Sequence, residues 1–165
     1  MSYQEKRTIT SISTCVLLLA AYLIYAFSPA RLGRVGSDDL SAWSITMLIF
    51  MGIGIAATII IQIIFHILLS ISIAVRAKMQ DQECDEEDIE RSVNSEMVED
   101  ERDKIIELKS NRVGFIVAGI GFLGALVSQV LHYSPVIMLN ILFIAFSFGS
   151  ICEGIAQLVY YRKGM

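Results

Sequence analysis

Four stretches of the chain are almost entirely apolar and long enough to cross a membrane as helices. They cover residues 9–27, 43–75, 113–131 and 136–161. A helix needs about 20 apolar residues to cross roughly 30 Å of hydrocarbon, and residues 40–75 and 113–152 carry no charged side chain. The pattern therefore predicts an all-α fold, in which residues 1–165 form a single integral membrane domain of four transmembrane helices.

The second stretch is longer than one straight crossing requires. Its length as a helix would be about 50 Å, at about 1.5 Å per residue. It contains no Pro, Asn or Asp that could form a turn between two shorter spans. We therefore count it as one helix, which either tilts and projects into the cytosol or bends near Gly52 and Gly54.

The distribution of basic residues predicts which ends of the spans are cytoplasmic. With four spans, the N-terminus, residues 76–112 and the C-terminus lie on one side, and these segments carry eleven Lys and Arg residues. The opposite side carries only Arg31 and Arg34. Because short cytoplasmic flanks are enriched in Lys and Arg, we expect a multi-pass protein of the cell membrane with both termini in the cytoplasm.

Residues 76–112 form the predicted cytoplasmic segment, an amphipathic, acidic helical segment between the second and third spans. Its acidic surface consists of Asp85, Glu86, Glu87, Asp88, Glu99, Asp100, Glu101 and Asp103. One interpretation is a solvated connector with local charge pairs, because charge runs are commonly solvated. The other is a surface that binds a basic cytosolic or membrane protein. A divalent-cation site is a weaker alternative, since the first four acids are adjacent and no glycine supplies a calcium-loop turn.

The run EDERDKIIELKSNR at residues 99–112 leads directly into a glycine-rich span, and the chain closes with Glu153 and YYRKG at residues 160–164. In these features it resembles small prokaryotic predicted integral membrane proteins of unassigned function. Those proteins carry such a charged segment before their last two spans and a similar closing motif. The resemblance covers about the last 70 residues, and it implies a four-span architecture and a prokaryotic origin.

Polar side chains inside the spans predict an intramembrane site. Gln62, His66 and Ser70 lie at intervals of four residues on one face of the second span, while Glu153 and Gln157 do so in the fourth. On straight helices His66 and Glu153 lie about 14–15 Å from the cytoplasmic ends, so they can share a layer. Ionisable groups in a membrane are costly. Either the pair fixes the register of the helices, or Glu153 titrates with His66 as its partner in a proton- or ion-responsive site.

The third span carries a stripe of small residues on one helical face. The stripe consists of Gly114, Ala118, Gly121, Ala125 and Ser128, at steps of four, three, four and three. Small residues let the backbones of two membrane helices approach closely. The stripe therefore predicts either close packing within the four-helix bundle or, as the alternative, a seam between two copies of the chain.

Several aromatic and polar residues lie near the ends of the spans. The aromatic ones are predicted to be interfacial anchors, and they are Tyr22, Tyr25, Trp43, Tyr133, Tyr160 and Tyr161. Asn140 is expected to hydrogen-bond to a neighbouring helix. We expect His132 to be an interfacial residue in a tight turn of residues 132–135 between the last two spans, and not a ligand.

Composition and motifs limit the function classes. The chain is 55% hydrophobic with a mean hydropathy of +0.61 and a net charge of −4, which excludes a soluble globular enzyme and a nucleic-acid binder. Its three cysteines form no disulfide framework and no zinc motif. We identify no catalytic, metal-binding or cofactor-binding motif, so neither a metal nor a cofactor is expected.

We therefore expect a non-enzymatic interaction, regulatory or scaffold protein that uses its acidic cytoplasmic helix. The alternative is a small proton- or ion-responsive transporter or channel subunit that acts as an oligomer. The expected partners are membrane lipid, a basic protein and a second copy of the chain.

Overall fold

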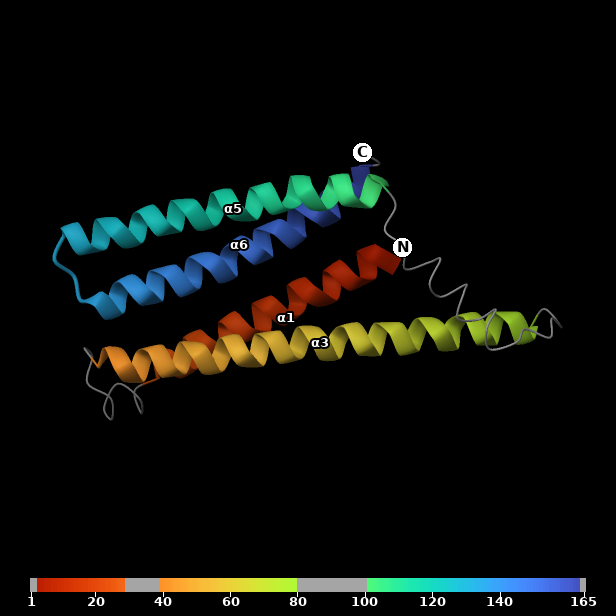
Figure 1. The fold of residues 1–165 in the computed structure, drawn as a ribbon, viewed down its shortest axis with the longest axis horizontal. Helices are drawn as coiled ribbons and strands as arrows, with labels where there is room; N and C mark the ends of the chain where they lie inside the picture. The colour runs from red at the N-terminus through yellow and green to blue at the C-terminus, as the bar shows by residue number, and fades with distance from the viewer. Residues whose placement is uncertain (1–2, 29–38, 80–100, 164–165) are drawn as a thin grey trace.

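The computed structural model describes residues 3–28, 39–79 and 101–163, and these residues form four α-helices. The helices are α1 (Tyr3–Ala26), α3 (Leu40–Met79), α5 (Glu101–Val130) and α6 (Pro135–Lys163), shown in Figure 1. All four are long and apolar enough to cross a membrane. The predicted all-α class is therefore confirmed for the described residues.

The helices extend beyond the predicted spans at their charged and polar ends. Helix α1 begins at Tyr3 instead of residue 9, and α5 already includes Glu101, twelve residues before the predicted start at 113. Acidic residues in the first turn of α5, and Arg162 and Lys163 in the last turn of α6, suit the helix dipole. Hydropathy predicts only the apolar part of each helix. The helical backbone hydrogen bonds continue into the polar residues on either side of it.

Helix α3 is one uninterrupted helix of 40 residues, about 60 Å long at about 1.5 Å per residue. It passes through Gly52 and Gly54 without a break, and at the end near Met79 it reaches beyond the other helices (Figure 1). The predicted bend near Gly52 and Gly54 is therefore absent, and the projection of this helix into the cytosol stays a prediction.

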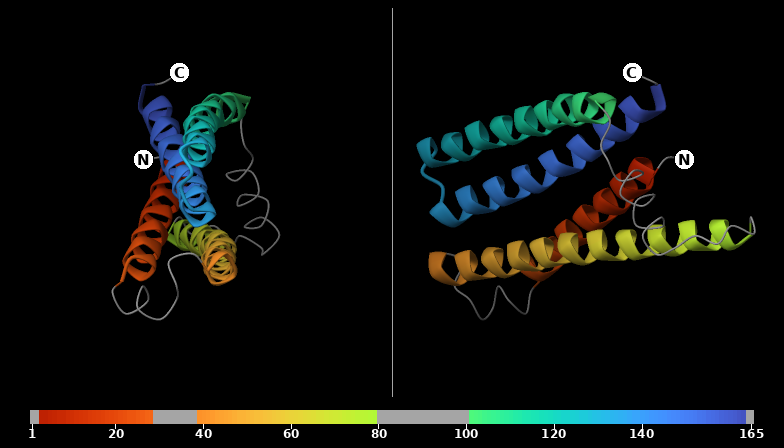
Figure 2. Two further views of the ribbon diagram at one scale, coloured as in Figure 1. Left: turned by 90° about the vertical axis from the view of Figure 1, so that its left-hand side faces the viewer. Right: turned by 45° about the vertical axis from the view of Figure 1, so that its right-hand side comes forward.

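The helices lie side by side in the order α5, α6, α1, α3 (Figures 1 and 2). Helices α5 and α6 form an antiparallel hairpin with the most extensive contact, α6 contacts α1, and α1 contacts α3. One end of the assembly holds the first residues of α1 and α5 and the last residues of α3 and α6; we call it the terminal end. The opposite end, with Ala26, Leu40, Val130 and Pro135, is the turn end.

The turn between α5 and α6 depends on a left-handed backbone conformation at His132, whose φ is 61°. The amide of His132 donates to the carbonyl of Gln129 at 3.0 Å, and that of Tyr133 donates to Ser128 at 3.0 Å. These bonds satisfy carbonyl groups at the end of α5, as in the common glycine-terminated helix ending. Pro135 then begins α6, where its fixed φ and missing N–H are tolerated.

Replacing His132 by glycine will raise the free energy of unfolding by up to about 1 kcal/mol, because glycine adopts positive φ without a steric penalty. Replacing it by valine will lower that free energy by about 1–2 kcal/mol, because a β-branched residue fits this conformation worst. The His132 side chain is exposed, so few contacts change. Thermal melting in detergent, followed by circular dichroism, measures both variants, and identical melting curves would contradict the prediction.

A buried cluster joins three helices at the turn end. It consists of Tyr22 and Ala26 from α1, Trp43 and Met47 from α3, and Val136 from α6. The predicted role of Tyr22 and Trp43 as interfacial anchors is wrong, because their side chains are only 0% and 4% exposed. Their bulk instead fills the space where α1, α3 and α6 meet.

A buried hydrogen bond crosses this cluster. The Tyr22 hydroxyl donates to Oδ1 of Asn140 at 2.7 Å, and Nδ2 of Asn140 donates to the Val136 carbonyl at 2.8 Å. The prediction that Asn140 bonds to a neighbouring helix is confirmed, since Tyr22 lies on α1 and Asn140 on α6. The centre of the Tyr22 ring also lies 4.2 Å from that of the Phe143 ring, with the two planes tilted by 38°, and 5.4 Å from that of the Phe50 ring in an edge-to-face arrangement.

The small-residue stripe of α5 lies against α6. A Cβ placed on Gly121 would overlap the Cβ of Ala145, and one on Gly149 of α6 would lie 2.9 Å from the Gly114 carbonyl oxygen and 3.5 Å from the Ala118 Cβ. Within the stripe, Gly114, Ala125 and Ser128 are buried. The stripe thus packs inside this chain, as the first of its two predicted roles requires.

Candidate functional site

A polar cavity of about 180 Å³ opens between α1, α5 and α6 at the terminal end. We call it the terminal-end cavity. It is lined by Gln4, Arg7, Thr8, Ser11, Asp103, Glu107, Glu153, Gln157 and Tyr161. Most other side chains of the described helices are apolar. In the terminal-end cavity, by contrast, polar and charged side chains from three helices lie close together.

The packing of α5 on α6 positions the Glu153 side chain. A Cβ placed on Gly114 would lie 3.0 Å from the Glu153 Cβ and 3.1 Å from its Oε2. The missing side chain of Gly114 therefore leaves the space in which the carboxyl group lies against α5. Glycine at position 114 therefore allows α5 and α6 to approach closely, and it also leaves room for the Glu153 carboxylate between them.

Helix α1 closes the cavity through a buried hydroxyl. The Thr8 side chain is 6% exposed, and its Oγ1 lies 3.2 Å from Oε1 of Gln157 and 2.9 Å from the carbonyl oxygen of Gln4. The bond to Gln157 links residues at opposite ends of the sequence. It joins α1 to α6 where both helices line the cavity.

The lining of the terminal-end cavity is acidic. Asp103 and Glu107 lie one turn apart on α5, Glu153 comes from α6, and Arg7 is the cation among the lining residues. Three carboxyl groups against one guanidinium group favour a ligand that carries positive charge. The amide, hydroxyl and phenol groups that complete the wall can donate or accept hydrogen bonds.

A second cavity, of about 350 Å³, lies between α1 and α3. Gln62 lines it, together with Thr14 and Thr58, and it shares Arg7 and Ser11 with the terminal-end cavity. We call it the α1–α3 cavity.

The predicted intramembrane residues are therefore divided between two adjoining cavities. Glu153 and Gln157 line the terminal-end cavity, whereas Gln62 lines the α1–α3 cavity. Ser70 lies on α3 and is partly buried. His66 also lies on α3, but its side chain is outside the described residues, so its pairing with Glu153 stays a prediction.

Most of the predicted acidic surface, residues 85–100, also lies outside the described residues. Its last two members, Glu101 and Asp103, lie in the first turn of α5. Glu101 is exposed, whereas Asp103 is partly buried and lines the terminal-end cavity. The acidic character of the segment thus continues into the cavity.

Arg7, Thr8 and Glu107 line the cavity but were not predicted as site residues. In the sequence, Arg7 is one of the basic residues that predict the orientation of the spans, and Glu107 is one of several charged residues that precede the third span. A usable signal exists in the topology: the flanks of α1, α5 and α6 meet at one end, and Asp103 and Glu107 share a helical face at a spacing of four. Which of the flanking charges face inward depends on helix rotation, which the sequence does not specify.

Cys15 and Cys152 are free thiols on α1 and α6. Among residues 3–28, 39–79 and 101–163, no group of three or more His, Cys, Asp and Glu side chains is placed to hold a metal ion. The side chains that line the terminal-end cavity can form ion pairs and hydrogen bonds and can bind protons.

Comparisons of the chain with known protein families, with curated proteins and with solved structures find no match. The resemblance of residues 99–112 and of the closing motif to small prokaryotic membrane proteins stays a prediction.

Proposed function

We propose that the chain is an integral, multi-pass membrane protein without enzymatic activity that binds a basic partner at its acidic cytoplasmic end. Four long apolar helices support the membrane location, because large apolar side chains are exposed along all of them. The terminal end carries the Lys- and Arg-rich flanks, so it is the cytoplasmic end in this proposal.

The observation that carries the proposal is the acidic lining of the terminal-end cavity. Asp103, Glu107 and Glu153 converge there from two helices, and the cavity opens at the end where both termini lie. A Lys or Arg side chain of a partner matches such a cavity in charge and in hydrogen-bonding capacity. The partner's class is thus a cytosolic or membrane protein with an exposed basic segment.

Neutralising two of the carboxylates by the double substitution Asp103→Asn/Glu107→Gln will weaken binding of an oligolysine peptide by about tenfold, since each partly exposed ion pair contributes up to about 1 kcal/mol. The protein is reconstituted in nanodiscs of uncharged lipid, and binding is measured by fluorescence anisotropy of the labelled peptide at low salt. Both residues lie near the start of α5, away from its packing stripe, so we expect the fold to persist.

The matched control is Glu5→Gln/Glu101→Gln, which removes the same charge at the same end from residues that do not line the cavity. We expect the control to change affinity by less than about twofold. Equal losses in both double variants would contradict a role of the cavity, and absence of peptide binding by the unmodified protein would contradict the proposal as a whole.

The alternative function, a proton- or ion-responsive transporter or channel subunit, draws support from Glu153. Its carboxyl group lines a cavity that adjoins the α1–α3 cavity through Arg7 and Ser11. Proton or cation flux across liposomes that contain only the purified protein would favour this alternative over partner binding.

A further inference from the structure

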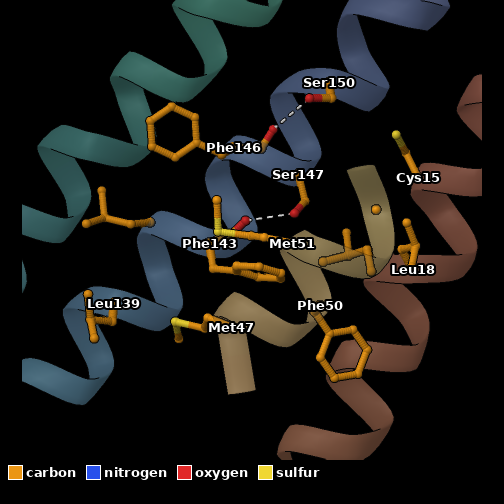
Figure 3. Close-up of a pocket in the computed structure, with 13 residues that line it drawn as sticks. Cys15, Leu18, Met47, Phe50, Met51, Leu139, Phe143, Phe146, Ser147 and Ser150 are labelled. Carbon is orange, nitrogen blue, oxygen red and sulfur yellow. Dashed lines mark hydrogen bonds between the residues drawn. The ribbon is translucent and has the colours of Figure 1, made fainter. Parts of the chain in front are cut away.

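An apolar groove of about 450 Å³ separates α1, α3 and α6 midway along the helices (Figure 3). Its lining includes Cys15 and Leu18 from α1, Met51 and Gly54 from α3, and Leu139 and Phe143 from α6. The groove exists because α3 contacts the other helices closely only near the turn end. Beyond Met47, none of its described side chains is buried.

The few hydroxyl groups in the groove are already used within their own helices. Ser147 donates to the Phe143 carbonyl at 2.8 Å and Ser150 to the Phe146 carbonyl at 3.2 Å. Figure 3 shows both bonds beside the apolar lining. The walls therefore offer no unused hydroxyl proton to a ligand, and an apolar chain fits them better than a polar molecule does.

The groove continues towards the terminal end and becomes more polar on the way. It shares Cys15, Leu18, Met51 and Gly54 with the α1–α3 cavity. That cavity in turn reaches Arg7 at the edge of the terminal-end cavity. We call the groove and the α1–α3 cavity together the α1 track, because α1 lines it from Leu19 to Arg7.

The dimensions and polarity of the α1 track match one leaflet of a bilayer. Leu19 and Arg7 are separated by twelve residues, or about 18 Å along the helix, and half of a hydrocarbon core is about 15 Å thick. Arg7 precedes the apolar part of α1, and Lys and Arg residues at the flanks of a span lie at the level of the lipid head groups.

We propose that the α1 track binds one phospholipid, with an acyl chain in the apolar groove and the phosphate at Arg7. The guanidinium group supplies paired donors for a phosphate. The adjoining carboxyl groups of Asp103, Glu107 and Glu153 disfavour a head group with net negative charge, so the ligand is a zwitterionic phospholipid. This inference rests on the membrane location given under the proposed function, but not on the basic partner.

The first test measures how much phospholipid stays bound. Protein is purified in detergent, incubated with phosphatidylethanolamine, washed with detergent and analysed by native mass spectrometry. We expect one lipid per chain for the unmodified protein and a loss of about tenfold in occupancy for Gly54→Leu, which fills the track where its two parts join. A Cβ at Gly54 would lie 3.5 Å from Cδ1 of Leu18, an ordinary contact.

Gly52→Leu is the matched control, because a Cβ there meets nothing within 4 Å and Gly52 does not line the track. It should retain the lipid. A second pair tests the head group: Arg7→Gln should lower phosphatidylethanolamine retention by about tenfold and leave diacylglycerol unchanged, whereas Lys6→Gln should change neither. Retention that is equal in Gly54→Leu and Gly52→Leu, or equal in Arg7→Gln and Lys6→Gln, would overturn the proposal.

A thiol-labelling measurement keeps the proposal testable even if Gly54→Leu fails to fold. In Cys84→Ser/Cys152→Ser protein, Cys15 reports on the track that it lines. Added phosphatidylethanolamine should slow its reaction with N-ethylmaleimide severalfold. In Cys15→Ser/Cys84→Ser protein, the remaining Cys152 lines neither part of the track and should react at an unchanged rate. An unchanged rate at Cys15 would contradict the proposal.

Failures of the two proposals are distinguishable. Protein that separates from membranes on fractionation would refute the proposed membrane function and this inference together. Protein that stays in membranes and binds oligolysine, but retains no phospholipid, would refute only the inference.

Discussion

Replacing Gly121 by alanine will lower the free energy of unfolding by about 1–3 kcal/mol, the usual cost of adding a methyl group to a closed packing site. The new Cβ would overlap the Cβ of Ala145 on α6. Neither atom can rotate away, because a Cβ is fixed by the backbone, so α5 and α6 must move apart. Titration with a denaturing detergent, followed by circular dichroism, measures the change.

Two control substitutions and one compensating substitution show whether the loss of stability comes from the contact with Ala145 or from alanine anywhere in α5. Gly119 and Gly124 lie on the same helix, and a Cβ at either meets nothing within 4 Å. Alanine at these positions should be neutral or stabilising by up to about 1 kcal/mol. Ala145→Gly in the Gly121→Ala background should restore most of the lost stability. Equal effects at Gly121 and Gly124 would contradict the close approach.

The fold class, and a close contact along the small-residue stripe of α5, could be predicted because they depend on local patterns. A run of apolar residues fixes a helix in a membrane by length alone. A stripe of small residues such as that from Gly114 to Ser128 predicts that another helix packs closely on this face, without identifying that helix. The sequence could not identify Gly149 and Ala145 as that partner, because α6 presents small residues on more than one face.

The polar cavity was only partly predicted, since it forms from the rotation and depth of three helices. Glu153 stood out as the one acid in its apolar stretch. Arg7 and Glu107 did not, because charged residues at the flanks of spans are ordinary. The misassignment of Trp43 has the same origin: an aromatic residue at the end of a span is an anchor when it faces lipid, but a core residue when a neighbouring helix covers it.

The two ends of the assembly differ in what holds them together. At the turn end, α3 is tied to α1 and α6 by the buried cluster that includes Tyr22 and Trp43. Towards the terminal end α3 has no buried described side chain after Met47, and cavities separate it from α1. The anchoring of α3 therefore depends on the turn end, where Tyr22 both packs against α3 and donates the buried hydrogen bond to Asn140.

Replacing Tyr22 by phenylalanine will lower the free energy of unfolding by about 1–3 kcal/mol, because it removes a donor from a buried acceptor while the ring still fills the cluster. Asn140 is 8% exposed, so its Oδ1 has little access to water. Tyr133→Phe is the matched control: its side chain is 54% exposed, and the loss of its hydroxyl should change stability by less than about 0.5 kcal/mol.

A double-mutant cycle with Asn140→Leu identifies the bond itself as the cause. If Tyr22 and Asn140 stabilise the protein through their mutual bond, Tyr22→Phe should cost little once Asn140 is leucine, and the coupling free energy should reach about 1 kcal/mol or more. Additive losses would instead mean that each side chain acts through separate contacts. Because α1 and α6 are joined here at one end and by Thr8 and Gln157 at the other, a measurable coupling would show that the Tyr22–Asn140 bond itself stabilises the contact between α1 and α6 at the turn end.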